Sequence, residues 1–318
     1  MFLLLTNQRD ITTDFIVREL RSRGHEFFRL NTESLCEGKV SLSPASADAW
    51  VYAIGEKLLD ASKIGAAIFR RPGTPEVSDS INDAGERTYS QIEWAALLRS
   101  IYLRLEGRWL NSPTKIAIAE DKPYQIQHAV RLNFNVPETL VTNNIHEANE
   151  FIRTHQCIIG KPLKAALLEG EQERVIFTSR LSKLETADEK CLAVAPVIFQ
   201  REIPKRYDIR VTVVGTKVFA TAIHSQAFAG TTVDWRRGSV PEMVHESIEL
   251  PVAISDQCVN LVEYLGLRFG AIDLILGTDG RYWFLEINPN GQWAWIENRT
   301  GAPIAGAIVD ELETIARS

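Results

Sequence analysis

The stretch YWFLEINPNGQW, residues 282–293, places polar side chains at alternate positions of an otherwise apolar run. Successive side chains of a β-strand point to opposite faces, so Glu286 and Asn288 share one face. A carboxylate among apolar neighbours is costly unless it has a partner, and a bound cation is a common partner. The pattern therefore indicates a cation site on a strand.

A second carboxylate, Asp273, lies in the preceding apolar run, and the turn sequence GTDG joins the two runs as a hairpin. Counting back from the turn puts Asp273 opposite Phe284 and diagonal to Glu286, roughly 7–8 Å away. A slip of one residue in this register would move Asp273 to the other face. With the amide of Asn288, these oxygen donors suit Mg²⁺ brought in with nucleotide phosphates. A solvated acidic face is the alternative, and the apolar neighbours argue against it.

Two lysines are candidates for binding phosphate. Lys161 ends the apolar run CIIGKPL, where an exposed lysine is unexpected, and Lys122 lies in the sequence DKP. A lysine ammonium is a compact charge that suits phosphate oxygens. A surface lysine is the alternative at each position.

Asp208 and Arg210 lie two residues apart in RYDIRVTVVG, so they share one face of a strand. We expect Asp208 to orient the guanidinium of Arg210, whose planar fork suits a carboxylate or a phosphate. Arg210 is therefore a candidate for binding an acidic substrate side chain or the transferring phosphate, and a structural ion pair is the alternative. Arg236, in the loop sequence DWRR, is a second candidate for the same charge.

The elements that position these residues begin with an N-terminal α/β unit. Apolar runs at Phe2–Leu5 and Glu26–Leu30 flank helical spacing at Asp14–Leu20, an order typical of parallel sheets. A further run, GAAIFRR, ends in Arg70 and Arg71. Strand ends of such sheets often carry sites, and two solvated surface arginines are the alternative.

A long helix over Thr88–Leu105 ends before a break at residues 111–113, and one helix is expected over Lys115–Asn133. Strand and helix patterns then alternate as in a small α/β lid, with a hairpin or mobile loop over Gly170–Ser182. Five strands are expected in and near the last block: Val194–Ile203, Asp208–Val214, Val218–Ala222, Gly270–Leu276 and Arg281–Ile287. A final helix is expected over Ile304–Ala316. We expect their sheet to be largely antiparallel. The expected domains are 1–113, 114–198 and 199–318, and the fold class is α/β (α+β).

The 318 residues carry a net charge of −6 and are 45% hydrophobic, as is ordinary for a globular protein. No broad basic excess exists, so no nucleic acid is expected as a partner. The start MFLLL meets polar residues at once, which predicts a buried strand rather than a signal peptide or membrane span. The four cysteines lack C-x-x-C spacing, which favours neither a zinc site nor a disulfide framework. We expect a cytoplasmic protein with no membrane partner.

Taken in order, the motifs resemble the ATP-grasp superfamily: DK at 121–122, IGKP at 159–162, FQREI at 199–203, DIR at 208–210, Asp273, and EINP at 286–289. The sequences RYDIRVTVVG, VDWRRG and EINPNGQWAWIE extend beyond this minimum. They resemble the graspetide, or microviridin-type, macrocyclases, which install ester and amide links in ribosomal peptides. Unlike many ATP-grasp lids, the stretch after Lys161 has only Gly170 where a glycine-rich loop is expected.

The resemblance implies an ATP-grasp fold with a preceding α/β domain, and ATP and Mg²⁺ as cofactors. A substrate carboxylate would attack the γ-phosphate, and a hydroxyl or amine would then displace phosphate from the acyl phosphate. Such chemistry relies on positioning and charge neutralisation. Lys122 and Lys161 would face the phosphates, and the metal ligands would be Asp273, Glu286 and Asn288.

The resemblance also implies a hinge formed by Gln200, Arg201, Glu202 and Ile203, whose backbone would read the adenine edge, with Glu202 near the adenine or ribose. The implied partner is a ribosomal precursor peptide with a leader and an acidic core, and the implied assembly is a homodimer. Two other functions stay open. One is a ligase that adds amino acids to a protein tail or a small acid, and the other is an ATP-binding regulatory protein without turnover.

Overall fold

The computed structural model describes residues 1–164, 167–168, 174–237 and 242–318. Its N-terminal part is built on a parallel sheet of β1 (Phe2–Thr6), β2 (Phe27–Asn31) and β6 (Ala66–Phe69), in the order β2-β1-β6. Helix α1 (Ile11–Ser22) connects β1 to β2, and the side chain of Asp10 caps its first turn. The predicted β-α-β start is confirmed.

A second, antiparallel sheet that the sequence did not predict covers one face of the parallel sheet. Its strands, in the order β3-β4-β5, are β3 (Lys39–Leu42), β4 (Trp50–Ile54) and β5 (Lys57–Asp60). Short 3₁₀ turns, η1 (Thr32–Glu37) and η2 (Ala61–Lys63), flank it. Trp50 and Tyr52 pack with Leu3 and Leu5 of β1 in one buried core. The apolar run AWVYAI at residues 49–54 marks β4, but β3 and β5 are partly exposed strands of four residues and leave no long apolar run in the sequence.

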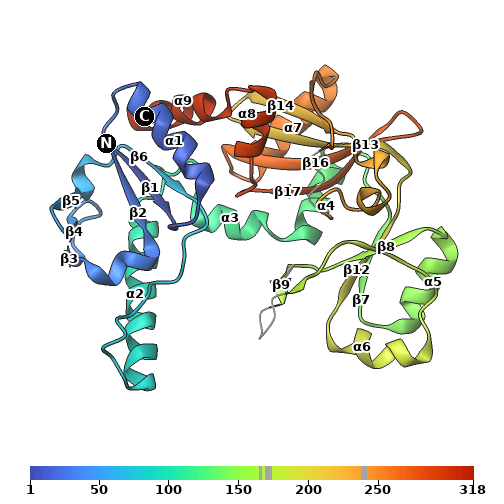
Figure 1. The fold of residues 1–318 in the computed structure, drawn as a ribbon, viewed down its shortest axis with the longest axis horizontal. Coiled ribbons are helices and arrows are strands. Elements are labelled where there is room, and N and C mark those ends of the chain that lie inside the picture. The colour runs from blue at the N-terminus through green and yellow to red at the C-terminus, as the bar shows by residue number, and fades with distance from the viewer. Residues whose placement is uncertain (165–166, 169–173, 238–241) are drawn as a thin grey trace.

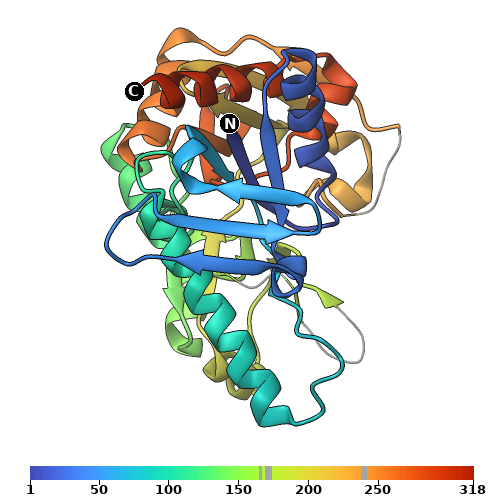
Figure 2. The same ribbon diagram turned by 90° about the vertical axis from the view of Figure 1, so that its left-hand side faces the viewer.

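Helix α2 (Ala84–Arg104) extends away from the body of the molecule, as Figures 1 and 2 show. The side chain of Asp83 caps its N-terminus. Its buried residues, Leu98 and Ile101, lie in its C-terminal half, which is the half that packs on the N-terminal core.

The single helix predicted over Lys115–Asn133 is wrong, because the chain forms α3 (Pro113–Ala119) and α4 (Lys122–Arg131). Pro123 has no N–H, so it cannot continue the hydrogen bonds of α3. The carbonyl of Ala119 instead accepts from Nε2 of Gln125 at 2.6 Å. Asp121 lies between the helices and caps α4, which fixes the position of Lys122 at the start of that helix.

The central part forms a separate antiparallel sheet in the order β11-β8-β12-β7, which we call the lid; it hangs below the C-terminal sheet in Figure 1. Its strands are β7 (Thr139–Thr142), β8 (Ile158–Lys161), β11 (Ser179–Leu181) and β12 (Val197–Arg201). Its helical elements are α5 (Ile145–His155), η3 (Thr186–Asp188) and α6 (Glu189–Val194). Strand β12 begins three residues later than predicted because α6 extends to Val194.

The hairpin or loop expected over Gly170–Ser182 is described only in part, and Gly170 lies outside the described residues. Strand β9 (Leu167–Leu168) pairs antiparallel with β10 (Arg174–Val175).

The C-terminal sheet is antiparallel throughout, in the order β15-β14-β13-β16-β17, which confirms its predicted character. Its strands are β13 (Lys205–Val214), β14 (Lys217–Ile223), β15 (His245–Ile248), β16 (Phe269–Gly277) and β17 (Tyr282–Asn288). One face packs on α7 (Val252–Tyr264), a helix that the sequence did not predict, and forms a large core. Two 3₁₀ turns, η4 (Ser225–Ala227) and η5 (Ala229–Thr231), follow β14.

The last two helices are α8 (Ala294–Thr300) and α9 (Ile304–Arg317). Helix α9 contacts α1 and β6 of the N-terminal part and β13 of the C-terminal sheet. It therefore lies in one core that both parts share. The predicted division into domains 1–113, 114–198 and 199–318 stays a prediction. Its second boundary, between residues 198 and 199, falls inside β12. No helix among the described residues combines the length and the apolar character needed to span a bilayer.

Candidate active site

The polar face of the C-terminal sheet brings Asp273 and Glu286 together, but by a different register from the predicted one. Phe284 pairs with Leu274, not with Asp273, so the predicted pairing is wrong by one residue. A β-bulge at Leu285 then restores Glu286 to the position directly opposite Asp273. The bulge therefore sets the carboxylates on one face, and it also directs Leu285 into the same cavity as Glu286.

Asp273 lies on the middle strand of three and pairs with residues on both sides. Arg210 of β13 is its cross-strand partner on one side, and Glu286 of β17 is its partner on the other. Asn288 lies opposite Ala271, two positions along the same face. The structure thus brings the three predicted metal ligands onto one face.

Arg210 is held by Asp273 and not by Asp208, so the predicted orienting partner is wrong. Nε of Arg210 donates to Oδ1 of Asp273 at 2.7 Å, and Nη2 lies 3.4 Å from Oδ2. Both side chains are largely buried, with 8% and 15% of their surface exposed. The ring of Trp235 covers the guanidinium, with its centroid 5.7 Å from Cζ.

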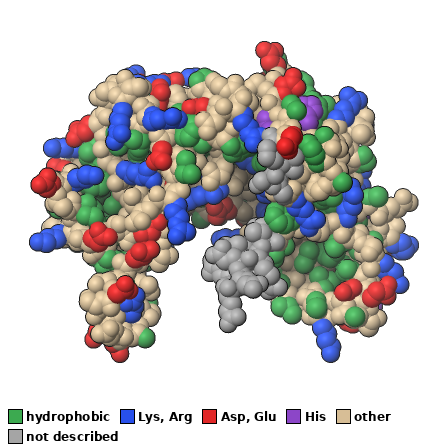
Figure 3. Space-filling view, viewed as in Figure 1, with side chains coloured by type: hydrophobic (Ala, Val, Ile, Leu, Met, Phe, Trp, Pro, Cys, Tyr) green, Lys and Arg blue, Asp and Glu red, His purple; other side chains and the backbone are tan. Residues whose placement is uncertain are grey.

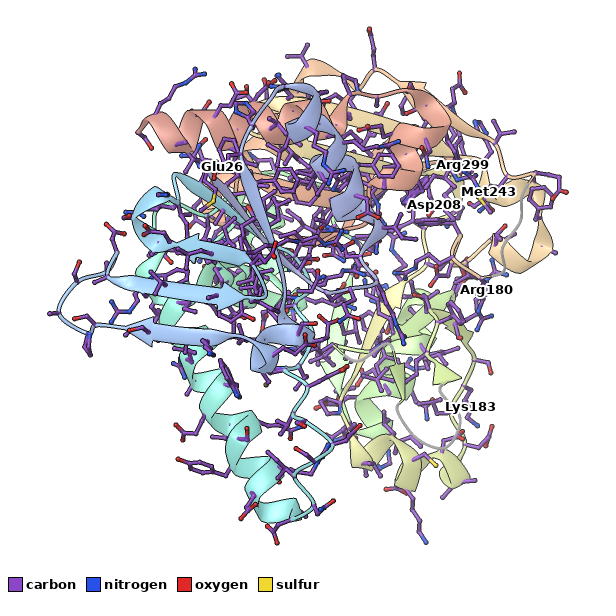
Figure 4. All side chains as sticks on the ribbon, turned by 60° about the vertical axis from the view of Figure 1, so that its left-hand side comes forward. Glu26, Arg180, Lys183, Asp208, Met243 and Arg299 are labelled. Carbon is purple, nitrogen blue, oxygen red and sulfur yellow. The ribbon has the colours of Figure 1, made fainter. Side chains whose placement is uncertain are left out.

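Asp208 instead belongs to a neighbouring buried pair. Its Oδ1 accepts from Nζ of Lys205 at 2.7 Å, and its Oδ2 accepts from the hydroxyl of Ser225. Burial raises the pKa of Asp208, and Lys205 opposes that shift. Figure 4 shows Asp208 above Arg180 of the lid, near the junction of the lid with the C-terminal sheet.

Glu286 lies among cations. Nζ of Lys122 is 3.5 Å from its Oε2, and Nη1 of Arg236 is 3.8 Å from its Oε1. Burial acts to raise the pKa of Glu286, but Lys161, Lys122 and Arg236 more than offset this, and the pKa falls below its usual value. By contrast, burial raises the pKa of Asp273 despite the attraction of Arg210.

Lys161 and Lys122 meet at this site from different parts of the chain. Lys161 ends β8 in the lid, is 8% exposed, and has a pKa of about 8, because burial disfavours its charged form. Glu286 opposes this shift and Lys122 adds to it. Nζ of Lys122 also donates to the carbonyl of Pro162 at 3.0 Å, which links α4 to the end of β8.

Arg236 is fixed by its own loop. Its Nε and Nη2 donate to the two carboxylate oxygens of Asp234, at 2.8 and 2.9 Å. Asp234 is 4% exposed, so it is a firm anchor for this guanidinium. Burial lowers the pKa of Arg236, but Asp234 outweighs it and the net shift is upward.

Several of these side chains line one cavity between the lid and the C-terminal sheet. Its charged and amide lining residues are Lys161, Gln200, Asp208, Asp234, Arg236, Asp273 and Glu286, whereas Lys122, Arg210 and Asn288 are not among its lining residues. The space-filling view shows the surface hollowed below the C-terminal sheet, beside the lid (Figure 3). Further lining residues that the sequence did not single out for the site are Ile159, Thr178, Trp235, Leu274 and Leu285. Of these five residues, only Trp235 lies in a motif that the sequence marked, DWRR. The other four have no local sequence feature that predicts a place in the cavity.

Comparison with known proteins identifies the family of the chain. Residues 119–312 match the RimK-like ATP-grasp domain, which is more than half of the chain. The chain belongs to the RimK-like ATP-grasp family. The predicted resemblance to ATP-grasp ligases is thereby confirmed, and so is the predicted enzyme class.

Solved structures similar to this ATP-grasp ligase include peptide-modifying enzymes. The macrocyclase MdnC from Microcystis aeruginosa MRC, bound with precursor peptide MdnA, is 29% identical, with a TM-score of 0.85 over 99% of each chain. A Chryseobacterium gregarium RiPP-associated ATP-grasp ligase, in complex with ADP and a leader and core peptide, is 26% identical. Its TM-score is 0.88 over 98% of this chain and 96% of that one. PsnB complexed with minimal precursor, Mg and ADP is 26% identical, with a TM-score of 0.78 over 100% and 98%.

A relative by sequence has a different name. The probable alpha-L-glutamate ligase of Cellvibrio japonicus (strain Ueda107) is 25% identical over 319 residues, covering 99% of this chain and 95% of the relative. Full-length similarity therefore extends to a macrocyclase, a RiPP-associated ATP-grasp ligase and a probable alpha-L-glutamate ligase.

The predicted hinge segment of the ATP-grasp ligase, residues 200–203, contributes Gln200 to the cavity. Gln200 is 1% exposed; its Nε2 donates to Oγ1 of Thr139 at 2.9 Å, and its Oε1 has no hydrogen-bond partner among the described residues. The carboxylate of Glu202 accepts two hydrogen bonds of 2.7 Å from Arg180. Arg201 pairs with Glu138, and its guanidinium lies over the ring of Trp283.

Ile203 is 7% exposed and packs in a small apolar cluster with Ile275, Trp283 and Leu285. Leu285, which also lines the cavity, continues that apolar surface toward Gln200. Residues 200–203 thus present an apolar surface beside Oε1 of Gln200, an acceptor without a hydrogen-bond partner among the described residues.

Arg70 extends this ATP-grasp site into the N-terminal part. It is 3% exposed and pairs with Asp10 at 3.0 Å, so the interpretation as a solvated surface arginine is wrong for this residue. Its Nη1 donates to the carbonyl of Gly291 at 3.2 Å, and its Nη2 donates to Oε1 of Gln292 at 3.0 Å. Arg70 therefore fixes the loop that follows Asn288.

The side-chain oxygens of Asp273, Glu286 and Asn288 fit Mg²⁺, because Mg²⁺ prefers oxygen ligands. No hydrogen bond to the carboxylate of Glu286 is found in the described ranges, and its nearest cations are 3.5 and 3.8 Å away. Lys122, Lys161, Arg210 and Arg236 surround Asp273 and Glu286. The carboxylates of Asp208 and Asp234 also line the cavity, and they are paired with Lys205 and Arg236 respectively. Of the cations, Lys161 and Lys122 have the largest effect on the pKa of the Glu286 carboxylate, so they are the cations that suit the phosphates of a magnesium–triphosphate complex.

Proposed function

We propose that this ATP-grasp ligase forms side-chain ester or amide crosslinks in a ribosomally made precursor peptide. The observation that carries the proposal is full-length similarity, at 26–29% identity, to the macrocyclase MdnC, MdnB and the RiPP-associated ligase. Each similarity covers at least 96% of both chains, so it includes the N-terminal part as well as the catalytic domain.

The first step in this proposal activates a substrate carboxylate. A carboxylate oxygen attacks the γ-phosphorus of ATP, the bond to the β-phosphate oxygen breaks, and ADP leaves. Lys161, Lys122 and Arg236 neutralise the phosphate oxygens, and Asp234 keeps Arg236 in position. Bound Mg²⁺, held by Asp273, Glu286 and Asn288, would supply further neutralisation of the phosphates.

The second step forms the crosslink. A side-chain hydroxyl or amine of the same peptide attacks the carbonyl carbon of the acyl phosphate and loses its proton, and inorganic phosphate leaves with the oxygen of the former carboxylate. Each crosslink therefore removes one water from the peptide and converts one ATP to ADP. We assign Arg210, oriented by Asp273 and covered by Trp235, to the acidic side chain or the transferring phosphate.

The nucleotide base is assigned to the hinge. The unpaired Oε1 of Gln200 is an acceptor for an amino group, and the cluster of Ile203, Ile275 and Leu285 is an apolar surface for a ring. The hinge backbone from Gln200 to Ile203 is assigned to the adenine edge, and Glu202, held by Arg180, to the vicinity of the adenine or ribose.

The partner in this proposal is a precursor peptide with a leader and an acidic core. MdnC was solved with the precursor peptide MdnA, and the Chryseobacterium gregarium ligase was solved with a leader and core peptide. We further propose a homodimer in the cytoplasm, tested by light scattering of the purified protein and by cell fractionation.

The intact mass of a precursor peptide encoded beside this protein tests the function. After incubation with the protein, ATP and Mg²⁺, we expect the loss of one water per crosslink, with ADP formed in step. A gain in mass would instead support the second candidate, a ligase that adds glutamate, which the name of the Cellvibrio japonicus relative favours. Glu286→Gln protein is the control for catalysis, and a peptide without acidic core residues is the control for substrate.

A further inference from the structure

A second hollow lies in the N-terminal part of the chain, along the outer edge of β2. It encloses about 520 Å³ between α1, β2 and the first residue of β5. No residue lines both this hollow and the active-site cavity. Glu26, which precedes β2, and Asp208 of the active site lie on opposite sides of the view in Figure 4. We call this hollow the β2 groove.

Half of the eight residues that line the β2 groove are cationic. Arg18 and Arg21 come from α1, Arg29 from β2 and Lys57 from β5, while Asp14 supplies the only carboxylate of the lining. Arg29 pairs with Asp14, and across the described residues Arg18, Arg21 and Lys57 form no ion pair. This excess of positive charge lies on a chain whose net charge is −6. The groove is therefore suited to an acidic ligand.

Aromatic rings hold two of these arginines in position. Cζ of Arg18 lies 4.3 Å from the ring centroid of Phe15, and Cζ of Arg21 lies 5.7 Å from that of Phe27. A guanidinium on a ring face loses freedom while its N–H groups stay available at its edge. Arg18 and Arg21 are exposed, and each thus offers N–H donors that suit a carboxylate.

The groove also follows a free strand edge. Strand β2 is the outermost strand of the parallel sheet and pairs with β1 alone. The N–H of Phe2 donates to the carbonyl of Glu26, and a parallel ladder uses every second residue. The backbone groups of Phe27 and Arg29 therefore point away from β1, where another strand could pair with them.

We propose that the β2 groove binds an extended peptide segment with acidic side chains at alternate positions, which adds a strand to β2. Alternate side chains of such a segment face α1 together, so carboxylates two residues apart would meet Arg18 and Arg21. The side chains between them face β5 and Lys57. This site goes beyond the proposed ligase function and does not depend on it, because binding needs neither ATP nor the catalytic residues.

Binding is measured by fluorescence anisotropy with two fluorescein-labelled hexapeptides in the absence of ATP. One has the sequence Glu-Thr-Glu-Thr-Glu-Thr, and the other has the same composition in the order Glu-Glu-Thr-Thr-Glu-Thr, in which no two glutamates are two residues apart. We expect the alternating peptide to bind at least tenfold more tightly, because only it presents neighbouring carboxylates on one face to Arg18 and Arg21. Equal affinities would overturn the strand geometry, since they indicate attraction by charge alone.

Two charge-reversal variants test the location. Arg18→Glu with Arg21→Glu should weaken binding of the alternating peptide at least tenfold. Arg131→Glu with Arg153→Glu changes the net charge equally at exposed positions outside the groove, and it should change binding less than twofold. Equal losses in the two variants would overturn the site. Unchanged ATP hydrolysis and an unchanged thermal melt show that each variant is folded.

The backbone contacts are tested with N-methylated peptides. Methyl groups on every second nitrogen block pairing in one register only, so one of the two methylated forms should lose binding and the other should keep it. Retention by both forms would overturn strand addition. Inorganic phosphate at millimolar concentration should not displace the peptide, and displacement would instead identify a simple anion site.

Discussion

Because of Lys161, the affinity of the protein for ATP should depend on pH between 7 and 9. Its pKa is about 8 because the side chain is buried at the end of β8, among Lys122 and Arg236 as well as Glu286. The phosphates of ATP would favour the charged lysine, so its pKa rises when ATP binds. Binding must then be accompanied by proton uptake at any pH near or above 8.

The size of the effect follows from this pKa. With a pKa of about 8, roughly nine-tenths of Lys161 is protonated at pH 7 and roughly one-tenth at pH 9. If the complex keeps the lysine charged, ATP affinity falls about tenfold across these two units, or about 1.4 kcal/mol. Titration of Lys161 therefore leaves ATP affinity nearly constant below pH 7 and lowers it as the pH rises through 8.

Isothermal titration calorimetry gives both quantities. Titrations at pH 7, 8 and 9, each in two buffers of different ionisation enthalpy, yield the affinity and the protons taken up. We expect about half a proton per ATP at pH 8. Lys161→Arg should flatten the profile because arginine stays charged throughout, and Lys164→Arg, at an exposed position on the same segment, should leave it unchanged.

A wild-type affinity that is constant from pH 7 to 9, with no proton uptake, would refute the assignment of Lys161 to the phosphates. A slope that persists in Lys161→Arg would show that another group titrates.

Three further predictions concern the same cavity. Glu286→Gln should abolish nucleotide hydrolysis while circular dichroism stays that of a folded protein, and full activity would exclude Glu286 as a metal ligand. Arg210→Ala should lower the free energy of unfolding by about 3–5 kcal/mol, because it leaves Asp273 as a buried, unpaired carboxylate. The added change Asp273→Asn should recover most of that loss in urea denaturation, though not activity, and no recovery would mean that the pair does not govern stability. Gln200→Leu should lower the preference for ATP over GTP about tenfold by competition binding, as loss of one buried hydrogen bond predicts, and an unchanged ratio would remove Gln200 from base recognition.

Periodicity allowed much of the fold to be predicted. Alternation identified β13, β16 and β17 as strands, and helical spacing identified α1 and α9. These signals are local, because the strand and helix repeats span only a few residues. The antiparallel β3-β4-β5 sheet escaped prediction because its short strands depend on packing against β1.

Charge partners were the least predictable part of the site. Asp208 and Arg210 are neighbours in sequence and share a strand face, yet each pairs with a different residue. Asp273 is opposite Arg210 only because β16 lies beside β13, 63 residues away along the chain. The burial of Arg70 likewise depends on the loop at residues 290–292.

The sequence by itself determined which side chains could take part in the chemistry, which strand faces carry them, and the membership of the ATP-grasp family. The tertiary structure decided how those side chains pair with one another across the strands and the lid. The bulge at Leu285 places Glu286 opposite Asp273, and the lid brings Lys161 to both. The reason is physical: a side chain's face follows from the backbone repeat of its own strand, whereas register, burial and charge pairing are set by what other segments of the chain pack against it.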